Sequence, residues 1–94
     1  MTRACQTIRA ASKSAMGDLF GDWAAQYPKW FLAFSSAEPL ARQNPEWAPI
    51  RQFALLNTQN VESRMNGGDG VEVDVTSTEQ TYSLCAGIGI DLMD

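Results

Sequence analysis

The feature that most constrains the fold is a change in the spacing of apolar residues on either side of a glycine-rich run at residues 66–70. Before this run, apolar residues recur every three or four positions, which is the period of an amphipathic helix. After it, they alternate with polar residues, which is typical of a β-strand with one buried face. The sequence therefore predicts an α+β fold: two to four N-terminal helices over residues 3–65, packed on a C-terminal antiparallel β-hairpin over residues 71–92.

The first helix is expected from about Arg3 to Gln26, with Thr2 as its cap. Gly17 and Gly21 both weaken a helix, so we expect this segment to bend there or to break into two.

A boundary is expected at Tyr27, because a residue that precedes proline avoids the α region. Pro28 fits the first turn of a second helix that ends near Ser35. Since this helix is almost wholly apolar, it is expected to be the central element of the core.

Residues 35–49 contain three prolines and are expected to form a loop with short helical turns. Within this loop, Asn44 can cap a helix start that has Pro45 in its first turn. A third helix is expected from about Ile50 to Met65, where apolar residues recur at helical spacing. The Asn-Gly pair that follows Met65 is a usual helix end.

The expected hairpin has a short strand at residues 71–76, a turn at 77–80 and a longer strand at 82–92. The even-numbered residues of the longer strand are expected to face the core. An Ile88→Asp substitution should therefore unfold the domain, because it buries an unpaired charge.

The unequal strands leave an edge on which a second chain can pair. Gly87 and Gly89 lie on the outer face of the longer strand, where glycine permits close approach of another backbone. A strand capped within the chain is the alternative. The glycine-rich run itself lacks the lysine of a P-loop and is expected to be a flexible connector.

A chain of 94 residues is expected to form one domain, over residues 1–94, with a thin core. It contains no histidine, which excludes Ser-His and Cys-His nucleophiles. Asp18, Asp22 and Cys85 are weak candidates for carboxylate or thiol chemistry, and capping, solvation or burial explains each of them. No cofactor and no metal is expected, and the chain is expected not to be an enzyme.

No stretch approaches the ~20 apolar residues that a membrane span needs, and no apolar signal segment follows the first residues. The expected location is cytoplasmic, in a host cell if the chain is phage-encoded. Cys5 and Cys85 are then expected to be buried free thiols, although a bridge between them is geometrically allowed.

Aromatic residues are dense between residues 23 and 34, and most are expected to fill the core. Trp30 and Phe31 are adjacent and point about 100° apart on a helix, so a thin core does not readily cover both. Trp30, or Trp47 in the proline-rich loop, is therefore a candidate interface anchor.

The net charge is −4, and residues 66–94 carry six acids and no base. Glu72, Asp74 and Glu79 are candidates for contact with lysine or arginine of a partner, and mimicry of nucleic-acid phosphate is one form of this contact. Solubility alone is the alternative. The first 17 residues carry three bases and no acid, too few for a nucleic-acid surface. These bases are Arg3, Arg9 and Lys13.

These observations predict a small acidic binding protein that regulates or inhibits a protein partner. An anti-host or anti-defence inhibitor from a phage or mobile element is one form of this function. The alternative is a structural subunit that self-assembles, for example as a homodimer, through its C-terminal strand. The candidate partner-binding residues are Trp30, Trp47, Glu72, Asp74, Glu79, Gly87 and Gly89.

Overall fold

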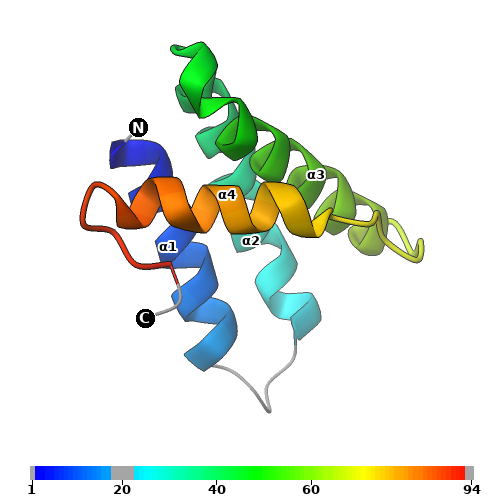
Figure 1. Cartoon of the computed structure of the whole chain (residues 1–94). Helices are drawn as coiled ribbons and strands as arrows, with labels where there is room; N and C mark the ends of the chain where they lie inside the picture. Colours follow the sequence, from blue (N-terminus) through cyan, green and yellow to red (C-terminus); the bar gives the residue numbers. More distant parts are fainter. Residues whose placement is uncertain (1, 18–22, 93–94) are drawn as a thin grey trace.

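The computed structural model describes the backbone of residues 2–17 and 23–92, and the side chains of residues 2–11 and 26–92. In this part of the chain every regular element is a helix (Figure 1). The elements are α1 (Thr2–Gly17), α2 (Trp23–Ala41), the 3-10 helix η1 (Pro45–Trp47), α3 (Ala48–Met65) and α4 (Val75–Ala86). The predicted α+β fold is therefore wrong.

Helix α2 is central, because it packs against both α1 and α3, while α4 packs on α3 and is drawn across the other helices in Figure 1. The buried apolar side chains form one cluster. No helix in the described ranges is long and apolar enough to cross a membrane. The core cluster comprises Ala4, Cys5, Ile8, Ala11, Phe34, Ala37, Ala41, Ile50, Phe53, Ala54, Cys85, Ile90 and Leu92.

Helix α4 occupies most of the segment for which the sequence predicts a hairpin. Asp74 is its N-cap, and the Asp74 carboxylate accepts a hydrogen bond of 2.8 Å from the Ser77 backbone N–H. This bond satisfies one of the donors that a helix start leaves open. The residues expected to turn the chain, 77–80, therefore lie inside a helix.

The buried face of α4 consists of Ser77, Thr81 and Cys85, which are spaced four residues apart. The Thr81 hydroxyl lies 2.7 Å from the Ser77 carbonyl oxygen and 3.1 Å from that of Pro49, so its burial is compensated by hydrogen bonding. Because this face is polar, the spacing of apolar residues does not reveal it. The β-branched residues around it favour a strand in the sequence alone.

The chain after α4 is a turn and not a strand. The Ile90 backbone N–H donates to the Cys85 carbonyl oxygen at 2.9 Å, and Gly89 has a φ of 85°. Ile90 and Leu92 are buried, but Ile88 is 41% exposed. The expectation that Ile88 faces the core is therefore wrong.

Helix α2 also differs from its prediction, since it runs through Pro28 and continues past Ser35 as far as Ala41. A proline inside a helix removes one backbone hydrogen bond and crowds the preceding turn. Here α2 packs on two other helices and buries Phe34, so tertiary packing outweighs the local cost. The expected boundary at residue 27 is wrong, and the loop after α2 is shorter than predicted.

Other predicted boundaries are confirmed. Helix α1 ends at Gly17, where a break is one of the two expectations, while Gly21 lies outside the described residues. The Asn44 side chain caps η1 by accepting from the Glu46 backbone N–H at 3.0 Å. Helix α3 ends at Met65, and Gly67 follows with a φ of 82°.

Cys5 and Cys85 form a disulfide with a Cα–Cα distance of 5.6 Å. Both residues are fully buried, as expected, but the expectation of free thiols is wrong. The bond joins α1 to α4 and so fixes which face of α4 points inwards.

Candidate functional site

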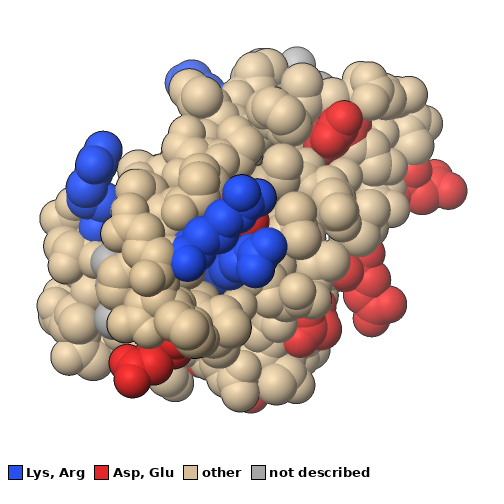
Figure 2. Space-filling view, turned by 90° about the horizontal axis from the view of Figure 1, so that it is seen from above, with Lys and Arg blue, Asp and Glu red and all other residues tan. Residues whose placement is uncertain are grey.

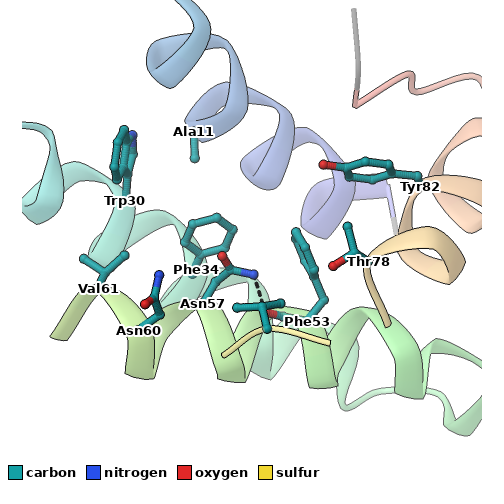
Figure 3. Close-up of a pocket in the computed structure, with 10 residues that line it drawn as sticks. Ala11, Trp30, Phe34, Phe53, Asn57, Asn60, Val61, Thr78 and Tyr82 are labelled. Carbon is teal, nitrogen blue, oxygen red and sulfur yellow. Dashed lines mark hydrogen bonds between the residues drawn. The ribbon is translucent and has the colours of Figure 1, made fainter. Parts of the chain in front are cut away.

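An apolar pocket of about 360 Å³ opens between the helices, and side chains from α1, α2, α3 and α4 line it. Figure 3 shows the aromatic side chains of α2 and α3 projecting into a common space, with Ala11 facing them from α1 and Tyr82 approaching from α4. We call this site the aromatic pocket. Its lining residues are Ala11, Trp30, Phe34, Phe53, Asn57, Asn60, Val61, Val73, Thr78 and Tyr82.

Three aromatic rings form a continuous wall of the aromatic pocket. The Phe34 and Phe53 ring centroids are 5.9 Å apart with an interplanar angle of 79°. The Phe53 and Tyr82 centroids are 6.2 Å apart at 67°. These edge-to-face contacts favour a fixed arrangement of the rings, which is what a preformed apolar site requires.

Polar atoms stand among these rings. The Asn57 Nδ2 donates to the Phe53 carbonyl oxygen at 2.8 Å, as Figure 3 shows, and the Thr78 hydroxyl donates to the Asp74 carbonyl oxygen at 2.9 Å. Among the described residues, no hydrogen bond engages the Asn57 Oδ1, the Asn60 Nδ2 or the Tyr82 hydroxyl. The aromatic pocket therefore offers both an acceptor and donors to a bound group.

Helix α3 holds the segment that carries Val73 to the rim. The Asn60 Oδ1 accepts from the Val71 backbone N–H at 2.9 Å, and the Ser63 Oγ accepts from the Gly70 backbone N–H at 3.2 Å. Gly70 has a φ of 91°, and a Cβ built on it would overlap the Asn60 Oδ1. The glycine-rich run, expected to be a flexible connector, is thus hydrogen-bonded to α3 on one side of the aromatic pocket.

The described side chains around the aromatic pocket are apolar or neutral. Thr78 and Tyr82 supply hydroxyl groups there, and among the lining residues that the structure describes there is no carboxylate or amine. In residues 2–17 and 23–92 no group of three or more Cys, Asp or Glu residues is placed to hold a metal ion. This arrangement suits the binding of an apolar group with one or two hydrogen bonds.

The structure places the two tryptophan candidates in different surroundings. Trp30 is half-buried and lines the aromatic pocket, and its ring centroid lies 5.7 Å from that of Tyr27, which is not part of the lining. Trp47 is half-buried at the end of η1 and packs on the core cluster. Only Trp30 therefore contributes to this site.

The acidic candidates do not form one hairpin face. Glu72 is exposed in the segment before α4, and Glu79 is exposed on α4 itself. Asp74 is half-buried as the α4 cap, and the hydrogen bonds from the Ser77 backbone N–H and side chain lower the pKa of Asp74. Asp74 thus has a structural role whether or not it contacts a partner.

Gly87 and Gly89 are exposed in the turn after α4, so the strand contact expected of them has no basis in the structure. Asp18 and Asp22 lie outside the described residues, as do the side chains of Lys13 and Trp23.

Sequence reasoning missed the polar residues of the aromatic pocket. Asn57 and Asn60 are three residues apart in a helix whose apolar face contains Phe53 and Val61, and this interruption of the apolar face is the signal that could have found them. Thr78 and Tyr82 are four residues apart on one face of α4, but the sequence alone predicts a turn and a strand there.

No protein-family model, curated protein or solved structure matches this chain. The assignment of the site therefore depends on its own geometry.

Proposed function

We propose that this chain is a non-enzymatic binding protein that regulates or inhibits a protein partner, and that its aromatic pocket receives an apolar side chain of that partner. The observation that carries this proposal is the wall of Phe34, Phe53 and Tyr82 rings, with neutral hydrogen-bonding groups beside it.

The aromatic pocket has the character of an interface hot spot. A side chain that enters it leaves water and contacts rings that are already packed, so little ordering of the site opposes binding. The open Asn57 Oδ1 and the Tyr82 hydroxyl can fix the orientation of the inserted group.

Apolar surface continues outside the aromatic pocket, which favours a protein over a small molecule as the occupant. Val73 lines the aromatic pocket. Val71, two residues before it, is 36% exposed, and Val75, two residues after it, is 69% exposed. A small ligand inside the pocket would leave these two side chains in water, whereas a protein that inserts one side chain can also cover them.

Charge around the same segment favours a partner with basic residues beside its apolar anchor. Asp69 and Glu72 are exposed in the segment that carries Val71 and Val73, and the whole chain has a net charge of −4. Lysine or arginine on the partner would meet these carboxylates and increase the rate of association.

Affinity capture with two variants of one residue tests this proposal. Asn57→Phe fills the aromatic pocket, whereas Asn57→Ala leaves it open, and both remove the same hydrogen bond to the Phe53 carbonyl oxygen. We expect wild type and Asn57→Ala to recover one stoichiometric protein that Asn57→Phe does not recover. Recovery of that protein by all three would exclude the aromatic pocket as its binding site.

The compartment is also part of the proposal. The sequence predicts the cytoplasm, whereas the Cys5–Cys85 disulfide favours an oxidising compartment. Alkylation of the thiols before any reduction, in protein taken from its native source, decides between the two. That the chain is an anti-host inhibitor carried by a phage or mobile element remains a prediction, and it concerns both the source of the chain and the identity of its partner.

A further inference from the structure

One carboxylate inside the molecule binds two arginines on its surface. Glu38 of α2 is 6% exposed, and its Oε1 accepts from the Arg42 Nε at 2.7 Å and from the Arg51 Nε at 3.0 Å. Arg42 follows α2 and Arg51 belongs to α3, so the carboxylate brings together guanidinium groups from two parts of the chain. We call these three residues the Glu38 cluster.

The position of the carboxylate fixes how the two guanidinium groups are presented. Since both Nε atoms bond to the same oxygen, the groups lie side by side with Nε turned inwards. The Arg42 and Arg51 side chains are nevertheless 59% and 52% exposed, so the terminal N–H donors are available at the surface.

The charges of the Glu38 cluster do not cancel. Burial alone raises the pKa of Glu38, but the hydrogen bonds and charges of Arg42 and Arg51 outweigh it and hold that pKa below its ordinary value. Glu38 is therefore ionised at neutral pH, and one positive charge is left over. Figure 2 shows basic atoms gathered around a small acidic patch near the middle of the face seen from above.

We propose that Arg42 and Arg51 form a binding site for a carboxylate group that the protein partner supplies from an aspartate, a glutamate or its C-terminus. Paired N–H donors in the plane of a guanidinium group match the two oxygens of a carboxylate. A carboxylate also carries the single negative charge that neutralises the cluster, whereas a phosphate monoester carries about −1.5 to −2 and would reverse its sign.

This site lies outside the lining of the aromatic pocket and deepens the proposed function, since it adds a second kind of contact with the same partner. It rests on the proposed function only for the source of the carboxylate. The experiment below uses no partner, so its failure and the failure of the proposed function are distinguishable.

The test is a nuclear magnetic resonance titration of the full chain with sodium acetate, with sodium chloride and with sodium phosphate at equal ionic strength. The Arg42 and Arg51 Nε–H resonances report binding directly. We expect them to shift saturably with acetate, with an apparent Kd at least roughly fivefold below that for either other salt. Equal responses to acetate and chloride would overturn the proposal, and tighter binding of phosphate would overturn the assignment to a carboxylate.

Variants separate the shape of the site from its charge. Replacement of both arginines by lysine (Arg42→Lys with Arg51→Lys) keeps the charge and removes the paired donors, so acetate binding should weaken by about tenfold. Lys29→Ala, which removes an exposed cation elsewhere on α2, should leave it unchanged. Because the lysine variant has no Arg42 or Arg51 Nε–H resonances, its acetate binding is followed by the chemical shifts of backbone amides. Acetate affinity equal to wild type in that variant would show that charge alone attracts the anion and would overturn the proposal.

Discussion

Cys5 of α1 and Cys85 of α4 are joined by a disulfide across 80 residues of sequence, and both are fully buried. Helix α4 also packs on α3, so the bond connects the first and last helices of the structure through the core. The disulfide thereby closes a loop that contains most of the chain.

Removal of this disulfide should destabilise the protein strongly. The bond limits the conformations of the unfolded chain, and chain entropy for a loop of this length makes its loss worth about 4.5 kcal/mol. Urea unfolding of Cys5→Ala with Cys85→Ala, compared with wild type under oxidising conditions, measures the difference. The same wild-type protein in reductant serves as a control. Identical urea midpoints with and without reductant would show that Cys5 and Cys85 do not form a stabilising disulfide.

Two isoleucines after α4 should respond in opposite ways to an acidic substitution. Ile90 is 8% exposed, so Ile90→Asp buries an unpaired charge and should cost about 3 kcal/mol or more. Ile88 is 41% exposed, and Ile88→Asp should change stability by less than about 1 kcal/mol. Thermal unfolding followed by circular dichroism checks both variants. Losses of similar size in both variants would restore the even-numbered strand face that the sequence predicts, since both isoleucines belong to that face.

Gly70 should tolerate alanine less well than Gly67. Both have positive φ, so alanine strains the backbone at either position, but only at Gly70 would the new Cβ overlap a neighbour, the Asn60 Oδ1. Gly70→Ala should therefore be less stable than Gly67→Ala by about 1 kcal/mol or more, and it should displace Val73. Chemical denaturation of the two variants gives this difference, and equal stabilities would show that the segment is not held against α3.

Stability should fall in acid, because the pKa values of Glu38 and Asp74 lie below their ordinary values in the folded protein. The unfolded chain then binds protons more readily than the folded one. The stabilisation is complete above the unfolded pKa values of about 4 and is lost as the pH falls through the lower folded values. Thermal midpoints between about pH 6 and pH 3 measure this loss.

Glu38→Gln provides the control for that pH dependence. It should lower stability near neutral pH by about 1 kcal/mol, since both arginine partners are solvated, and it should reduce the loss in acid. Glu62→Gln, at an exposed glutamate of α3, is the matched control and should retain the wild-type dependence of stability on pH. An unchanged profile in Glu38→Gln would show that this carboxyl does not contribute.

The sequence is informative where local signals and packing agree. Asn44 with Pro45 marks the start of η1, and the Asn-Gly pair marks the end of α3, because capping depends on the residues themselves. The aromatic density of α2 correctly indicates where part of the core lies, since Phe34 is buried.

The sequence misleads where the buried face of a helix is polar. The Thr81 hydroxyl donates to the Ser77 carbonyl oxygen, and the Ser77 side chain hydrogen-bonds to the Asp74 cap, so both residues can face the interior without an apolar pattern. The alternation of apolar and polar residues from Tyr82 onwards predicts the burial of Ile90 and Leu92 correctly but that of Ile88 wrongly. The aromatic pocket could not be predicted either, because it depends on how α4 packs against α3 and on the disulfide that holds α4 to α1.

The dissociation constant of the partner complex, measured by calorimetry with Asn57→Phe and Asn57→Ala, tests the binding role of the aromatic pocket most directly. Asn57→Phe should raise that constant by at least about tenfold relative to Asn57→Ala, because the added ring occupies the space that the partner's side chain needs. Circular dichroism of both variants confirms that each is folded. Equal dissociation constants would contradict the account, since the partner would then bind elsewhere on the molecule.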